Sequence, residues 1–279
     1  MSARLQSNHY GKHMVRLLRV QRNDDVHDVA EWEADIVLEG ELSGSYLGAD
    51  NSSIVPTDTI KNTVLALAHD RSEVTRDEFA LLLAEHFLSR YPHLSAVDAE
   101  VRERLWTRMA LDGTPHPHAF VRDGNGQPYS TVRQERAQPV CSAAGIRGFV
   151  ILKTTASGFS GYPQCEFTTL PETSDRILST SLDARWDYGG GTADLQAGVL
   201  DVMLKVFAET FSPSVQRTMF QMGEAALAAF SGIERIHLTM PNRHYLSLDL
   251  SQLKRPADQK TIFIPTDDPF GFIEAVVAR

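Results

Sequence analysis

The chain has few of the features that mark a secreted, membrane or disulfide-stabilised protein. Its 279 residues include only two cysteines, Cys141 and Cys165, too few for a disulfide framework or a cysteine-rich zinc site. No apolar run approaches the roughly 20 residues that a membrane-spanning helix needs. Residues 1–10 lack the apolar segment of a secretory signal, and the C-terminal residues are not a peroxisomal Ser-Lys-Leu address. We therefore expect a soluble protein of the reducing cytoplasm.

Basic charge is also scarce. The chain has 27 Lys and Arg against 36 Asp and Glu, a formal net charge of −9 at pH 7, and it shows no basic stripe. This pattern argues against a nucleic-acid-binding protein. With 42% hydrophobic and 23% charged residues, the composition is that of an ordinary globular protein, and the length suits about two domains.

Two common ligand-binding motifs are missing as well. Gly189-Gly190-Gly191 has no lysine after it, so a loop is expected there rather than a phosphate-binding site. His116-Pro117-His118 could suggest a metal site. Its proline and the lack of a partner cluster favour a solvated loop instead.

Periodic patterns predict a similar series of elements in each half of the chain. In the first half, alternating apolar residues predict strands, and apolar residues at helical spacing predict helices. Thr75 and Glu78 form the pattern of a capping box at the start of one helix. The last strands flank the turn signal of Gly124 to Gly126. The strands are expected at 15–20, 30–39, 97–105 (where a helix also fits), 120–121 and 129–132, and the helices at 60–68 and 79–87.

The second half repeats this order. Strands are expected at 149–152, 182–188, 236–240 and 246–250, and helices at 195–206 and 215–226. Hairpins with grouped helices predict an α+β fold, with antiparallel sheets and helices on one face. We expect one module at 1–140 and another at 141–279. The charged faces of the strands need water, a ligand or another subunit.

The segment from Ile54 to Val64 carries the strongest local signal of a binding site. Thr57, Asp58 and Thr59 follow Pro56 at an expected helix start, where one capping side chain would suffice. Free backbone N–H groups at such a start favour a negative or electron-rich ligand. A plain connection between a strand and a helix is the alternative interpretation.

Three further clusters contain candidate site residues. Lys12, in Tyr10-Gly11-Lys12, precedes the first strand and could equally be a surface lysine. Phe159 could stack on a flat ligand or merely anchor its loop, and Arg176 could be a forked donor or a salt-bridge residue. Asn242 and His244 could face one pocket from a tight turn between the last strands.

Taken together and in this order, the motifs resemble the urate oxidase (uricase) family. The resemblance runs from Asn8 to about Glu274. Several short motifs in one order are more specific than any one of them. They are Tyr10 to Lys12, Asp50-Asn51, Thr57 to Thr63, Lys153 to Tyr162, Thr168 to Thr180, Val215-Gln216 and Pro241 to His244.

The resemblance implies two tandem copies of the tunnelling fold (T-fold). It also implies a homotetramer that closes the strands into barrels and places the active sites at subunit interfaces. The implied reaction is oxidation of urate by dioxygen and water to 5-hydroxyisourate and hydrogen peroxide, without a metal or an organic cofactor.

The same resemblance assigns a role to each candidate that binds the purine. Phe159 would stack on the ring. Arg176 and Gln216 would clamp its polar edge with paired hydrogen bonds, a geometry that suits arginine. The backbone N–H groups of Asp58 and Val215 would hold other heteroatoms.

The remaining candidates would carry the chemistry. By resemblance, Asn242 and Thr57 would hold dioxygen and then water over the ring. Lys12, Thr57 and His244 would form a proton relay, with Lys12 and Thr57 supplied by the neighbouring subunit. Threonine suits a relay because its hydroxyl both donates and accepts hydrogen bonds.

Two other functions stay open at this point. A purine-binding T-fold protein could retain the pocket without turnover, although Lys12, Thr57 and His244 are all present. A zinc-dependent pterin enzyme on the same fold would need Cys or His ligands, and the chain lacks a convincing set.

Overall fold

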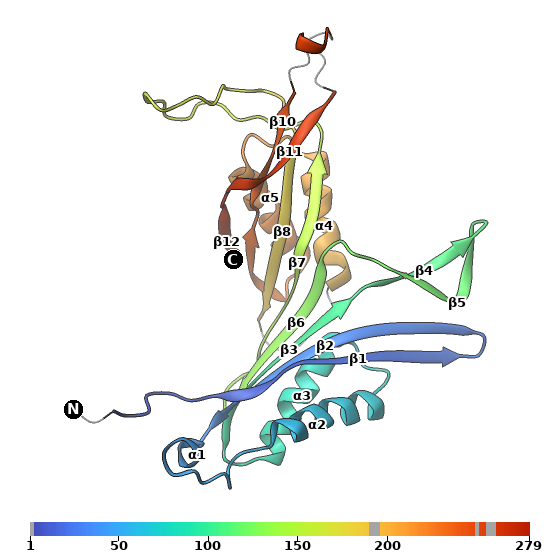
Figure 1. The fold of residues 1–279 in the computed structure, drawn as a ribbon, viewed down its shortest axis with the longest axis vertical. Helices are drawn as coiled ribbons and strands as arrows, with labels where there is room; N and C mark the ends of the chain where they lie inside the picture. Colours follow the sequence, from blue (N-terminus) through green and yellow to red (C-terminus); the bar gives the residue numbers. More distant parts are fainter. Residues whose placement is uncertain (1–2, 190–195, 249–250, 255–260) are drawn as a thin grey trace. The chain divides into compact units, whose positions relative to one another are not determined.

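The computed structural model describes residues 3–189, 196–248, 251–254 and 261–279 (Figure 1). The chain divides into two compact units, one formed by 1–145 with 187–194 and the other by 146–186 with 195–279. Of the positions considered above, Gly190, Gly191, Leu195 and Leu250 lie outside the described residues. Within the described ranges, no helix has the length and apolar character needed to cross a membrane.

The first unit contains an antiparallel sheet in the order β1-β2-β3-β6. A separate hairpin is formed by β4 and β5. Helices α2 and α3 lie together on one face of the sheet (Figure 1). The bounds are β1 Tyr10–Asn23, β2 Val26–Gly40, α1 Ser43–Gly48, α2 Thr57–Asp70, α3 Arg76–Arg90, β3 Leu94–Arg104, β4 Trp106–Leu111, β5 Thr114–Arg122 and β6 Gln127–Glu135.

The core of this unit lies between the sheet and its two helices. Alternate residues of β2, from Trp32 to Leu38, are buried against apolar side chains of α3 such as Phe79 and Phe87. The predicted capping box of α3 is confirmed: the Thr75 hydroxyl accepts from the Glu78 N–H, and the Glu78 carboxylate accepts from the Thr75 N–H. The cap starts α3 at Arg76, and this start sets which of its side chains face the sheet.

The intervening residues of the same strands carry paired charges. Arg102 on β3 lies 2.9 Å from both Glu33 and Asp35 on β2 and 2.6 Å from Glu100. Burial alone would lower the pKa of Arg102, but its hydrogen bonds to Asp35 and Glu100 raise that pKa overall. Glu33 is only 4% exposed, so this charged face is partly covered by its own ion pairs.

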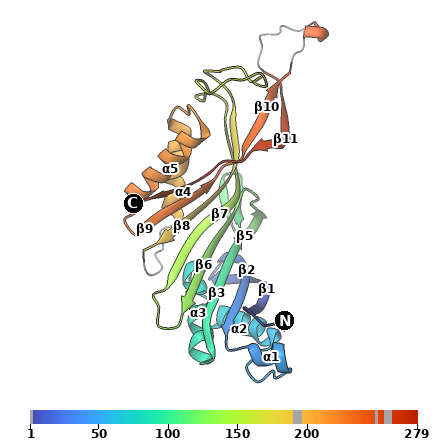
Figure 2. The same cartoon turned by 90° about the vertical axis from the view of Figure 1, so that its left-hand side faces the viewer.

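The second unit has the strand order β7-β8-β10-β11, and β9 pairs with both β8 and β12. Helices α4 and α5 pack together, and α5 lies along β9 and β12 (Figure 2). The bounds are β7 Cys141–Lys153, of which this unit contains the residues from 146 on, β8 Leu178–Tyr188, α4 Gln196–Glu209, α5 Val215–Ala229, β9 Ile233–Thr239, β10 Asn242–Ser247, η1 Ser251–Leu253, β11 Phe263–Gly271 and β12 Glu274–Ala278.

The expected α+β class with antiparallel sheets is confirmed, and most expected elements are present. Two expectations are wrong. His116 to His118 lie in β5 rather than in a loop. Strand β5 pairs with β4 in a two-stranded hairpin, and a strand with an open edge tolerates Pro115 and Pro117. Asn242 and His244 lie in β10 rather than in a tight turn between strands. Elements α1, β4, η1, β11 and β12 were not predicted. Cys141 and Cys165 are both exposed and unpaired.

Candidate functional site

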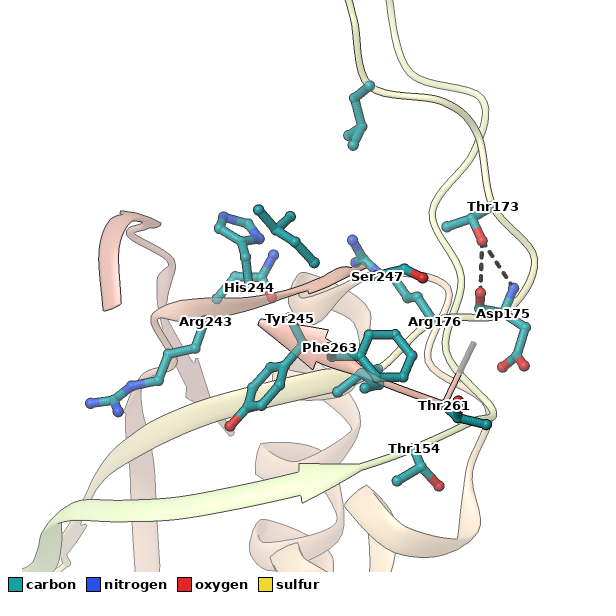
Figure 3. Close-up of a pocket in the computed structure, with 14 residues that line it drawn as sticks. Thr154, Thr173, Asp175, Arg176, Arg243, His244, Tyr245, Ser247, Thr261 and Phe263 are labelled. Atoms are coloured by element: carbon teal, nitrogen blue, oxygen red, sulfur yellow. Dashed lines mark hydrogen bonds between the residues drawn. The ribbon is translucent and has the colours of Figure 1, made fainter. Parts of the chain in front are cut away.

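A cavity of about 620 Å³ lies in the second unit (Figure 3). Its walls come from β10, from the start of β11 and from the irregular segment that precedes β8. Three of the predicted site residues, Arg176, Asn242 and His244, line it together. The other lining residues are Thr154, Leu170, Thr173, Asp175, Ile177, Arg243, Tyr245, Leu246, Ser247, Thr261 and Phe263.

Strand β10 supplies the amide and the imidazole of this cavity. Asn242 is paired with Thr180 of β8, and His244 is paired with Thr266 of β11. The register of β10 and β11 shifts between Asn242 and His244, so the regular alternation of a strand does not apply there. Both residues nevertheless line the same cavity and can meet one ligand. In Figure 3, His244 projects from one side of β10, and Arg243 and Tyr245 project from the other.

Arg176 lies over the ring of Phe159, the predicted aromatic platform. Its Cζ is 5.3 Å from the centroid of the Phe159 ring, and its backbone N–H donates to Ser157 O at 2.8 Å. Burial lowers the pKa of Arg176. The buried Nε has no hydrogen-bond partner within the described part of the chain. An unsatisfied forked donor next to an aromatic face fits a planar ligand with paired acceptors.

The backbone around Phe159 is held by a short ladder. Phe159 N–H donates to Thr173 O at 2.8 Å, and Thr173 N–H donates to Phe159 O at 3.0 Å. A Cβ on Gly158 would lie 2.9 Å from Thr173 O, so only glycine allows the two segments to approach this closely. The ladder places the Phe159 segment next to the cavity wall that contains Thr173 and Arg176.

Val215 and Gln216 start α5 and do not line the cavity. Their backbone N–H groups belong to the first turn, where no intrahelical partner exists. The Ser214 hydroxyl caps the helix by accepting from Arg217 N–H at 3.1 Å. Just before it, Ser212 accepts from Gly158 N–H at 2.8 Å, which joins the start of α5 to the Phe159 segment.

The first unit brings Lys12 close to the start of α2. Lys12 is partly exposed on β1, directly before the bulge that separates it from Val15. A Cβ on Gly11 would lie 1.8 Å from Ile36 O, so glycine is required at the centre of the Tyr10-Gly11-Lys12 motif. The pKa of Asp58 is lowered mainly by its hydrogen bond with Lys61, and the charge of Lys12 contributes to the same shift.

Helix α2 begins at Thr57, as predicted, with Pro56 as the N-cap. Proline offers no capping side chain, so the N–H groups of Thr57, Asp58 and Thr59 have neither an intrahelical partner nor a side-chain cap. The Asp58 carboxylate is held by Lys61 at 2.5 Å, which leaves these N–H groups open to a ligand. Thr57 and Asp58 are both exposed.

The predicted residues therefore form two groups. Lys12, Thr57 and Asp58 lie in the first unit, and all the other predicted site residues lie in the second. Sequence reasoning missed Phe263 and Thr261 of the cavity wall, because β11 was not predicted; the apolar pair Ile262 and Ile264 was the available signal. Among the described residues, no three His, Cys, Asp or Glu side chains are arranged to hold a metal ion.

Comparison with known proteins places these features in a family. The family model described as Uricase matches residues 8–133 and 142–274. The chain is 37% identical over 287 residues to a uricase of Aspergillus flavus, which covers 97% of this chain and 95% of the relative. It is 38% identical over 299 residues to a uricase of Arabidopsis thaliana, and this match covers 99% of this chain and 96% of the relative.

Solved structures agree with the sequence comparison. The crystal structure of a uricase from Arthrobacter globiformis superposes with a TM-score of 0.93 at 34% identity, covering 100% of this chain and 96% of that one. The family model, the curated relatives and this structure all span nearly the whole chain. The chain belongs to the uricase family.

Proposed function

We propose that this protein oxidises urate with dioxygen. Urate loses two electrons and two protons, which reduce dioxygen to hydrogen peroxide. Water then adds its oxygen to the oxidised ring and gives 5-hydroxyisourate, so one urate, one dioxygen and one water yield one product and one peroxide. The observation that carries this proposal is the cavity that Arg176, Asn242 and His244 line together, with Phe159 beside Arg176.

Binding of the purine uses shape and paired polar groups. Phe159 stacks on the ring, and Arg176 and Gln216 clamp the polar edge. The N–H groups of Asp58 and Val215 hold other heteroatoms, which is supported by the lack of intrahelical partners in the first turns of α2 and α5. The unsatisfied Nε of Arg176 supports the clamp, since a buried guanidinium donor needs an acceptor.

Proton movement uses a second set of side chains. Lys12 draws a proton from urate through the hydroxyl of Thr57, and His244 completes the relay. Asn242 and Thr57 hold dioxygen and afterwards water over the ring. A urate that has lost a further proton is more electron-rich and reduces dioxygen more readily. A water molecule that is already held beside the oxidised ring reacts faster because of its proximity. No organic cofactor or metal takes part in this scheme.

The active enzyme is proposed to be a homotetramer of two-module subunits. The modules are T-folds of residues 1–140 and 141–279, and the strands of several subunits close into barrels. Lys12 and Thr57 then reach the cavity from a neighbouring subunit. Exposed apolar side chains such as Leu18 on β1 and Val150 and Leu152 on β7 support this assembly, because a second copy would cover them. The cytoplasm stays the predicted location.

The test is to mix the purified protein with urate in air, with and without a chelator, and to follow the ultraviolet band of urate together with peroxide. Loss of the band with formation of peroxide in both samples is expected. No loss of urate would overturn the proposed activity, and activity that disappears with the chelator would overturn the metal-free scheme. A purine-binding protein without turnover would bind urate and leave the band unchanged.

A further inference from the structure

The ring of Phe159 is already stacked on one side by Tyr162. The two ring centroids are 4.8 Å apart and the planes differ by 12°. This is a parallel stack at contact distance, and it leaves no space for another ring between the two. A flat ligand that stacks on Phe159 must therefore use the opposite face.

Tyr162 is held in place by a hydrogen bond of its own side chain and by one from the backbone of the preceding residue. Its hydroxyl donates to the backbone oxygen of Leu170 at 2.5 Å, and Leu170 lines the cavity. The adjacent Gly161 donates its N–H to the carboxylate of Glu172 at 2.8 Å. Gly161 has a φ of 73°, a conformation that glycine adopts without strain. The ring of Tyr162 is thus tied to the cavity wall independently of Phe159.

Two separate anchors therefore act on the Phe159 side chain. Its backbone is paired with Thr173, and one face of its ring is covered by Tyr162. A phenylalanine whose backbone alone were fixed could still rotate about its side-chain bonds. Contact with a second anchored ring removes that freedom before a ligand arrives, which lowers the entropic cost of binding.

We propose that Tyr162 is a positioning residue for purine recognition: it covers the rear face of Phe159 and fixes the plane on which a single purine stacks. This inference rests on the proposed function, since it takes the purine as the ligand of Phe159. It concerns affinity rather than the chemical step, because Tyr162 holds the platform and is not one of the groups assigned to the proton relay.

The test is to compare Tyr162→Leu with Tyr162→Phe. Leucine keeps an apolar side chain but removes the stack, and phenylalanine keeps the stack but removes the bond to Leu170. Urate binding is measured under nitrogen, where dioxygen cannot consume it, and KM and kcat are measured in air. Loss of an aromatic stack of this kind is expected to change the dissociation constant by about three- to tenfold.

For Tyr162→Leu, we expect Kd and KM for urate to rise about three- to tenfold while kcat changes less than about twofold. Tyr162→Phe should restore most of the affinity. The matched control is Phe167→Leu, an aromatic in the same segment whose side chain is 82% exposed and which has no stacking partner within the described residues. It should leave Kd unchanged. Thermal unfolding and molecular size are measured for all three variants.

Unchanged affinity in Tyr162→Leu would overturn the inference, as would a fall in kcat at constant Kd. Tighter binding would also overturn it, because Tyr162 would then occupy the purine's own place on Phe159. These outcomes are read against the wild type in the same assay. A wild type that neither binds nor oxidises urate refutes the proposed function, whereas an active wild type with an unaffected leucine variant refutes only the role of Tyr162.

Discussion

The Tyr10 hydroxyl forms two hydrogen bonds with the backbone of Val55. It accepts from Val55 N–H at 2.6 Å and donates to Val55 O at 3.1 Å. Tyr10 lies two residues before Lys12 on β1, and Val55 lies two residues before Thr57 at the start of α2. One side chain therefore joins the two segments that carry Lys12 and Thr57. Burial raises the pKa of Tyr10, so its hydroxyl stays protonated and able to donate.

Replacing Tyr10 with phenylalanine should destabilise the protein and slow the reaction. The change leaves both polar groups of the Val55 backbone without their partner, which costs about 1–3 kcal/mol. Because Lys12 and Thr57 lose a shared anchor, kcat should fall more than the affinity for urate. Urea unfolding and steady-state kinetics measure the two effects. Tyr46→Phe is the control, since Tyr46 is 50% exposed and makes one 3.3 Å bond. Equal effects of both changes would contradict the anchoring role.

Lys12→Met should separate binding from turnover. Methionine keeps the length of the side chain but removes the amine that is proposed to draw the proton from urate. General acid–base groups typically contribute about 10²- to 10⁴-fold, so kcat should fall within that range. Binding of urate under nitrogen should change little. Lys205→Met, on an exposed position of α4, is the control. Full activity of Lys12→Met would remove Lys12 from the relay.

Arg176→Lys should weaken urate binding even though the positive charge is kept. Lysine cannot form two parallel hydrogen bonds from a planar fork. Loss of a charge-assisted hydrogen bond costs about 1.5–3 kcal/mol, which corresponds to roughly 10- to 150-fold in Kd. Titration with urate under nitrogen measures the change. Arg217→Lys, on the exposed side of α5, should bind urate normally. An Arg176→Lys variant with wild-type affinity would show that the fork does not clamp the purine.

The ion pairs of Glu33 should make the first unit sensitive to acid. Burial alone would raise the pKa of Glu33, but hydrogen bonds from Arg16 and Arg102 outweigh it and hold that pKa below the usual 4.5. The unfolded chain therefore binds more protons in this range, and stability rises with pH. The contribution is complete above about pH 4.5 and is lost as pH falls through the lower folded value.

Unfolding free energies measured in urea between neutral pH and the acid range test this expectation. Glu33→Gln should be less stable at neutral pH, because Arg102 loses a charged partner, and its stability should fall less steeply as the solution is acidified. Glu41→Gln, on an exposed position after β2, is the control. Parallel pH curves for wild type and Glu33→Gln would contradict the assignment.

Local signals in the sequence were sufficient for the features that depend on near neighbours. The start of α2 at Thr57 and the capping box of Thr75 follow from side chains within one helical turn. The pairing of Tyr10 with Val55 joins residues 45 positions apart and has no periodic pattern. The closeness of Arg176 and Phe159 depends on a ladder inside an irregular segment, where neither the strand nor the helix period applies.

The position of Asn242 and His244 shows why the start of β10 was misplaced: the strand begins at Asn242 and was expected to begin at Leu246. Pro241 and the polar residues after it read as a turn, because proline, asparagine and histidine are common outside strands. In the fold, Asn242 is already paired with Thr180 of β8, and this tertiary contact extends β10 toward Pro241. The register shifts between Asn242 and His244, but both residues line the same cavity, as their spacing in the sequence suggested.

The most direct test of the central claim is an oxygen balance with labelled water. Wild-type protein is mixed with urate and unlabelled dioxygen in water enriched in ¹⁸O, and urate, dioxygen, peroxide and the organic product are quantified. We expect equimolar loss of urate and dioxygen, equimolar peroxide without the label, and one labelled oxygen in the organic product. Urate that persists in this mixture would contradict the proposed activity, and a label in the peroxide would contradict the proposed order of electron transfer and water addition.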